Sequence, residues 1–115
     1  MAYLPLSTAN LPDPAIDPAQ ESSPQDYFST KLYTGNNSAR SITGVGLAPD
    51  WVWIKARNHG HNPEVYDSVR GPQKGLMPSY GDPEFTRGVT SFDSDGFSLD
   101  SSTYTNGSYN FVSWN

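Results

Sequence analysis

Three aspartates in the C-terminal third of the chain form its densest group of residues that could bind a metal. Asp93 and Asp95, in Asp93-Ser94-Asp95-Gly96, are followed closely by Asp100, and together they have the carboxylate density of a calcium-binding loop such as that of an EF-hand. The other ligands of that loop and its terminal Glu are missing. An Asp-Gly pair between apolar residues is instead a strong signal for a tight β-hairpin turn. The sequence therefore favours a hairpin and leaves the aspartates as weak metal candidates.

Two histidines, His59 and His61, are separated by one glycine and followed by Glu64 and Asp67. Histidine pairs that bind catalytic zinc in metalloproteases lie one helical turn apart with a Glu between them. This pair has neither feature, and it lies among Asn, Gly and Pro residues. We therefore expect a solvated loop here.

Other catalytic classes have no motif in this chain. The absence of cysteine excludes disulfides, a thiol nucleophile and a cysteine-based zinc site. No G-x-S-x-G nucleophile elbow and no phosphate-binding glycine loop is present. Any two of the twelve acidic residues could converge in space, but the sequence singles out no pair. We expect a non-enzymatic protein without a cofactor.

Aromatic side chains are the main candidates for contacts with another protein or with a glycan. They make up 13% of the residues, although the hydrophobic share is only 35%. Trp51, Trp53 and Trp114 are expected in the core or at a subunit interface. Tyr80 and Tyr104 lie in expected loops, so we expect them to be exposed, where they could recognise a host surface glycan.

The strand expected over 51–57 organises the elements that position these residues. Side chains alternate across a strand, so Val52, Ile54 and Ala56 share an apolar face, whereas Trp51 and Trp53 share the other. Both faces need cover at the tryptophan end, which is typical of a central strand.

The remaining segments also have the pattern of short strands. We expect a hairpin over 27–45, a strand over 64–70 with Val65 and Val69 facing inward, and an irregular loop over 71–84. A strand over 85–92 leads through the Asp95-Gly96 turn into 97–99, and a turn over 103–108 precedes a closing strand over 109–115. This spacing predicts an all-β, antiparallel, jelly-roll-like β-sandwich of about seven short strands.

Residues 1–26 differ in composition from the expected β-sandwich domain over 27–115. They contain half of the ten prolines and four acids without any Lys or Arg. A disordered tail is one interpretation. The segment also carries apolar residues that suit an extended arm lying across a neighbouring subunit: Tyr3, Leu4, Leu6, Leu11 and Ile16.

The overall charge and hydropathy narrow the classes of partner. The formal net charge of −5 argues against nucleic-acid binding, which needs a surplus of Lys and Arg. We find no apolar run long enough for a membrane span and nothing like a signal peptide.

Five blocks of the sequence, in order, resemble a domain found in bacteriophage structural proteins of the tail-fibre type. The blocks are Tyr33–Asn36, Ile42–Arg57, Asp67–Gly71, Ser91–Leu99 and Tyr109–Trp114. There are departures: Leu47 replaces an aromatic residue, Asp100 replaces a glycine, and the last block has one extra residue. The family usually continues past the last strand, so this chain is either a minimal version or is followed by more polypeptide.

The resemblance implies a virion structural protein assembled in the host cytoplasm, and it supplies no catalytic residues. We expect an attachment module of a tail fibre or spike, joined by its arm to a tail adaptor, baseplate or capsid protein. A homo-oligomer is expected, with a trimer favoured by analogy with phage fibres. A capsid decoration protein and a carbohydrate-binding receptor-recognition module are the alternatives.

Overall fold

The computed structural model describes residues 23–115. A 3₁₀ turn, η2 (Pro24–Asp26), precedes the first strand, and a short helix, α1 (Thr103–Asn106), precedes the last. Between and after them the chain forms nine strands: β1 (Thr30–Thr34), β2 (Arg40–Ile42), β3 (Trp51–Ala56), β4 (Glu64–Asp67), β5 (Lys74–Gly75), β6 (Phe85–Thr86), β7 (Val89–Asp93), β8 (Gly96–Leu99) and β9 (Asn110–Trp114).

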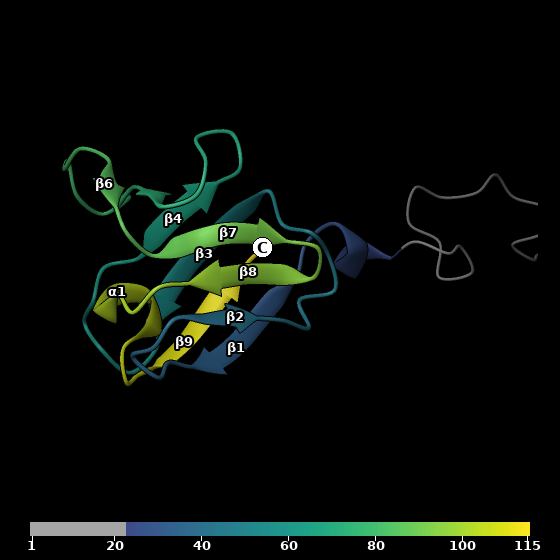
Figure 1. Ribbon diagram of the computed structural model, residues 1–115, viewed down its shortest axis with the longest axis horizontal. Coiled ribbons are helices and arrows are strands. Elements are labelled where there is room, and N and C mark those ends of the chain that lie inside the picture. The colour runs from purple at the N-terminus through teal and green to yellow at the C-terminus, as the bar shows by residue number, and fades with distance from the viewer. Residues whose placement is uncertain (1–22) are drawn as a thin grey trace, which may run out of the picture.

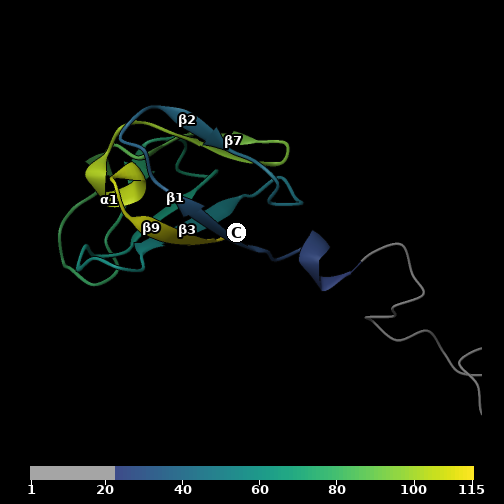
Figure 2. The ribbon, with the colours of Figure 1, turned by 90° about the horizontal axis from the view of Figure 1, so that it is seen from below.

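Seven of these strands form two sheets that pack face to face. The four-stranded sheet has the order β1-β9-β3-β4 and the three-stranded sheet the order β2-β8-β7, and all of the pairings are antiparallel. Figure 2 shows the two layers edge-on, with α1 at one end. Strands β5 and β6 form a separate small pair. The predicted all-β, antiparallel sandwich is confirmed, and β3 is a central strand of the larger sheet.

The core lies between the two sheets and is built from alternate residues of their facing strands. The larger sheet contributes Val52, Ile54 and Ala56, as the alternation in β3 predicts, together with Tyr66 and Phe111. The smaller sheet contributes Ile42, Val89, Phe97 and Leu99. Tyr33 of β1 stacks on Phe111 with ring centroids 5.3 Å apart, and its hydroxyl donates to the carbonyl oxygen of Thr105 at 2.7 Å. Burial raises the pKa of this tyrosine.

The hairpin predicted over 27–45 is wrong. Strand β1 pairs with β9 in one sheet, and β2 pairs with β8 in the other, so the Gly35–Ser38 connection crosses between the layers (Figure 1). Each of β1 and β2 pairs on one side with a strand from a distant segment, so the local turn signal did not set their pairing.

The orientation predicted for the 64–70 strand is also wrong. Strand β4 ends at Asp67, and Val69 lies beyond it with 95% of its surface exposed. Tyr66 and Glu64 face the core in place of the two valines. The register explains this, because Val52 of the core face pairs with Tyr66 and Ile54 pairs with Glu64.

Candidate interaction surface

The outer side of the larger sheet collects all three tryptophans of the chain. Alternation in β3 turns Trp51 and Trp53 away from the core. The register pairs Trp53 with Trp114 of β9 on one side and with Val65 of β4 on the other. Leu32 of β1 and Val112 of β9 are also opposite each other. We call this surface the Trp face: Leu32, Trp51, Trp53, Val65, Val112 and Trp114.

Among residues 23–115, nothing covers the most exposed part of the Trp face, although Val112 within it is buried. Leu32 is 56% exposed and Trp51 is 40% exposed, whereas Trp53 and Trp114 are half-buried. The indoles of Trp51 and Trp53 lie side by side, with ring centroids 6.0 Å apart. The tryptophans therefore lie outside the sandwich core, and their placement at a subunit interface stays a prediction. Scattered apolar residues are normal on a surface, but a contiguous aromatic patch marks an interaction site.

Apolar surface continues from the Trp face toward the beginning of the described chain. Tyr27 and Phe28 are 76% and 54% exposed. Together with Trp51 and Leu47 they line an open cleft of about 370 Å³. The predicted arm residues Tyr3, Leu4, Leu6, Leu11 and Ile16 lie outside the described residues. The cleft therefore connects Trp51 of the Trp face with Tyr27, the first residue after the predicted arm.

The three candidate metal-binding aspartates have separate structural tasks. Asp95 accepts hydrogen bonds from the backbone N–H groups of Gly46 at 2.8 Å and Gly44 at 2.9 Å, and these bonds lower its pKa. Asp93 accepts from the hydroxyls of two serines, and Asp100 accepts from the backbone N–H groups of Gly88 and Ser102. Within residues 23–115 no three His, Asp or Glu side chains are grouped closely enough to hold a metal ion. The carboxylates organise loops, and the predicted tight hairpin joins β7 to β8.

The two candidate recognition tyrosines have different surroundings. Tyr80 is 59% exposed. Tyr104 lies in α1, half-buried, with its ring centroid 4.4 Å from that of His61 and 4.4 Å from the Arg87 guanidinium carbon. Its predicted loop position and full exposure are therefore wrong, because neighbouring rings and a cation cover it.

The histidines belong to the same aromatic cluster as Tyr104. His59 and His61 have ring centroids 4.0 Å apart, and Tyr109 lies 4.3 Å from His59. His61 is half-buried, and its desolvation, with His59 as the next contribution, lowers its pKa. The loop therefore packs on α1 and the start of β9 through its imidazoles, a contact that the sequence interpretation missed.

A buried carboxylate was also missed. Glu64 is fully buried, accepts a hydrogen bond from the Tyr66 hydroxyl at 2.5 Å and one from Arg87 Nε at 3.0 Å, and forms an ion pair with the Arg87 guanidinium. Burial raises the pKa of Glu64, and the hydrogen bonds from Tyr66 and Arg87 oppose that rise. Burial and the adjacent carboxylate also raise the pKa of Tyr66. The only sequence signal is a Glu placed two residues before a Tyr at the start of a strand.

The helical content of the described residues is small. None of the helices in residues 23–115 has the length and apolar character needed to cross a lipid bilayer.

Comparison with known proteins identifies one family. The model of a domain of unknown function, DUF7483, matches residues 23–115, which is most of the chain. No curated protein and no solved structure matches the sequence or the fold.

Proposed function

We propose that this chain, which belongs to the DUF7483 family, is a non-enzymatic structural protein of a bacteriophage virion that acts as an attachment module of a tail fibre or spike. The β-sandwich is the displayed body, the proline-rich arm over residues 1–26 ties it to a neighbouring virion protein, and the Trp face is the interface between copies of the chain. The resemblance in sequence supports the phage assignment, and the Trp face supports the oligomer.

The observation that carries the assembly role is the composition of the Trp face. Aromatic residues are enriched in protein–protein interfaces and supply most of their hot spots. Here three indoles and three aliphatic side chains occupy the outside of the larger sheet. Lys55 lies on the same side of β3, but its ammonium group is turned to two carbonyl oxygens, those of Ala56 and His59 at 2.5 and 2.9 Å. The centre of the patch is therefore apolar. Its charged neighbours lie at the two ends: Lys55 at one, and Asp67, which is opposite Trp51 and pairs with Arg70, at the other.

Replacing Trp53 by serine is expected to abolish self-association while leaving the isolated domain folded. A half-buried indole on the outer face gives the monomer only cross-strand contacts, so we expect a stability loss of about 1 kcal/mol. A core tryptophan would cost about 3–5 kcal/mol. Sedimentation velocity of the full chain gives the mass, and urea unfolding gives the stability.

Val69→Ser is the matched control, because Val69 is also apolar but is 95% exposed, lies beyond the end of β4 and is not one of the Trp-face residues. It should leave both the mass and the stability unchanged. A wild-type chain that stays monomeric at all concentrations, or a Trp53→Ser variant that associates normally, would contradict the proposed interface.

The position of the protein in the particle separates the tail module from a capsid decoration protein. Gold-labelled antibody is expected to mark the tail of purified phage particles. Labelling spread over the shell would instead assign the decoration role, and unlabelled particles would contradict a virion protein. The glycan-binding alternative has less support, because only Tyr80 of its two tyrosines is freely exposed.

A further inference from the structure

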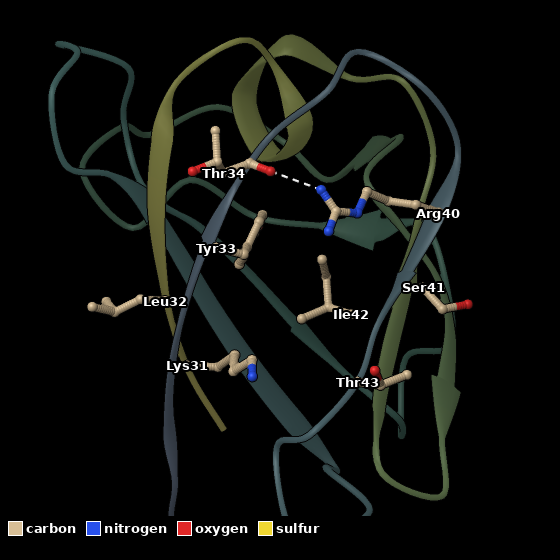
Figure 3. Close-up of a pocket in the computed structure, with 8 residues that line it drawn as sticks. All are labelled: Lys31, Leu32, Tyr33, Thr34, Arg40, Ser41, Ile42 and Thr43. Carbon is tan, nitrogen blue, oxygen red and sulfur yellow. Dashed lines mark hydrogen bonds between the residues drawn. The ribbon is translucent and has the colours of Figure 1, made fainter.

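The two sheets leave an open cleft along one side of the sandwich. Strand β1 is at one edge of the larger sheet, β2 is at one edge of the smaller sheet, and each pairs with a single neighbour. A cleft of about 420 Å³ lies between them. Figure 3 shows Tyr33 and Ile42 pointing toward each other across this gap, whereas Leu32 and Ser41 point away from it.

The opposite side of the sandwich is closed. Leu76 bridges the free edge of β4. Its backbone N–H donates to the carbonyl oxygen of Val65 at 3.1 Å, and its carbonyl oxygen accepts from the N–H of Val65 at 2.9 Å. The Arg87–Glu64 ion pair ties β4 to the segment that follows β6. Unpaired edge strands are the natural place for an added extended chain. Two of them, β1 and β2, lie on the two sides of one cleft, whereas the other edge of the smaller sheet, β7, accepts a backbone hydrogen bond at Val89 from Gln73.

Two cations line the cleft. Lys31 extends its ammonium group into it, and Arg40 reaches across it to donate to the carbonyl oxygen of Thr34 at 2.7 Å (Figure 3). Neither side chain forms an ion pair with any residue in 23–115. Asp95 is near enough for Lys31 to lower its pKa slightly, but its oxygens are directed to the N–H groups of Gly46 and Gly44. The cleft therefore has spare positive charge.

We infer that this cleft binds an acidic, extended peptide, and that the peptide is the segment around Asp13, Asp17 and Glu21 of a second copy of the chain. Residues 1–26 carry four acids and no base, which complements Lys31 and Arg40. Pro12, Pro14 and Pro18 favour extended geometry and lower the entropy cost of ordering the segment. This inference rests on the proposed association of copies. It assigns only the acidic part of the arm to a second copy, so that Tyr3, Leu4 and Leu6 are left to tie the chain to the neighbouring virion protein.

Reach and direction both suit a neighbouring copy. An extended proline-rich chain advances about 3 Å per residue, so the segment before β1 can span several tens of ångströms. Figures 1 and 2 show residues 23–29, including η2, running off the end of the sandwich opposite α1. This direction, together with the reach, is the ground for assigning the segment to a second copy.

The absence of cysteine allows a disulfide-trapping test in the full chain. One version, carrying a large tag, has Ala19→Cys between Asp17 and Glu21. The other, untagged, has Thr43→Cys at the rim of the cleft. After the two are mixed and mildly oxidised, we expect a disulfide-linked heterodimer with the summed mass. Val69→Cys in place of Thr43→Cys is the matched control and should give only background.

Three further variants test the charge of the cleft and the assignment to a second copy. Adding Lys31→Glu and Arg40→Glu to the Thr43→Cys chain should remove the cross-link. The neutral variant, Lys31→Gln with Arg40→Gln, takes its place if the charge-reversed chain does not fold, and it should weaken the cross-link. Added salt should also weaken the cross-link. A double-cysteine chain, Ala19→Cys with Thr43→Cys, that closes only within itself would overturn the second-copy assignment. A heterodimer yield equal to that of Val69→Cys, with mass-measured association intact, would overturn this inference and leave the Trp-face interface standing.

Discussion

Replacing Glu64 by alanine is expected to lower the free energy of unfolding by about 3 kcal/mol. The substitution removes the acceptor of the Tyr66 hydroxyl, which is fully buried, and the carboxylate that pairs with Arg87. Breaking a buried pair by deleting one partner costs about 3–5 kcal/mol because the other partner is left uncompensated. Arg87 retains 31% exposure of its side chain, so water recovers part of its solvation and the lower end of that range applies.

Glu84→Ala provides the matched control for this measurement. Glu84 also pairs with an arginine, Arg70 at 3.2 Å, but its side chain is 41% exposed. Exposed ion pairs contribute about 0–1 kcal/mol, so this variant should unfold close to the wild-type denaturant midpoint. Tyr66→Phe in the Glu64→Ala background should recover part of the loss, because it removes the orphaned hydroxyl. Equal midpoints for Glu64→Ala and Glu84→Ala would show that the buried network does not hold β4 to the segment after β6.

Gly96→Ala is expected to cost about 3 kcal/mol or more. Gly96 begins β8 after the tight hairpin turn with φ of +154°, and an added Cβ would lie 1.9 Å from the carbonyl oxygen of Ile42. The obstacle is backbone of the neighbouring strand, so it cannot move aside as a side chain would. Strain at such a φ costs about 1–3 kcal/mol, and the overlap adds a similar amount.

Two other glycines separate these contributions in the same urea-unfolding experiment. Gly46 has φ of +89° but open space around its Cβ position, so Gly46→Ala should cost only the backbone strain, about 1–2 kcal/mol. Gly81 has open space and no positive φ, so Gly81→Ala should be nearly neutral. A Gly96→Ala variant no less stable than Gly46→Ala would contradict the close approach of β8 to β2.

Local pattern was sufficient to predict the elements whose signal is short-range. Period-two alternation in 51–57 identified both the core face of β3 and the outward direction of its tryptophans. The Asp95-Gly96 pair identified the place of the β7–β8 hairpin, although the two turn residues are Ser94 and Asp95 and Gly96 already begins β8. The sandwich class followed from the spacing of such segments.

Pairing between distant segments could not be predicted in this way. Strand β9 lies between β1 and β3 in the sheet, and no pattern in residues 27–45 indicates that β1 pairs with β9. The orientation of β4 also depended on a distant residue. Arg87 supplies the charge that allows Glu64 to be buried, so the rule that valines face inward and glutamates outward failed there. Because side chains alternate, an error of one residue in which side faces the core puts every side chain of the strand on the wrong face.

The candidate site was only partly visible from sequence for the same reason. Trp51 and Trp53 were placed together by alternation, but Trp114 joins them only through the β3–β9 register. The β1–β2 cleft lies between two strands that the sequence analysis predicted to pair with each other as a hairpin. Its two cations, Lys31 and Arg40, come together because those strands are in different sheets.

Tryptophan fluorescence of the full chain during dilution tests the central claim most directly. All three indoles lie on the Trp face, so emission reports on that surface alone without a label. If copies of the chain cover the Trp face, dilution should shift the emission to longer wavelength and increase quenching by acrylamide. These changes should follow the same concentration dependence as the fall in mass measured by sedimentation. A fall in mass with unchanged emission and quenching would place the subunit interface elsewhere and contradict the account.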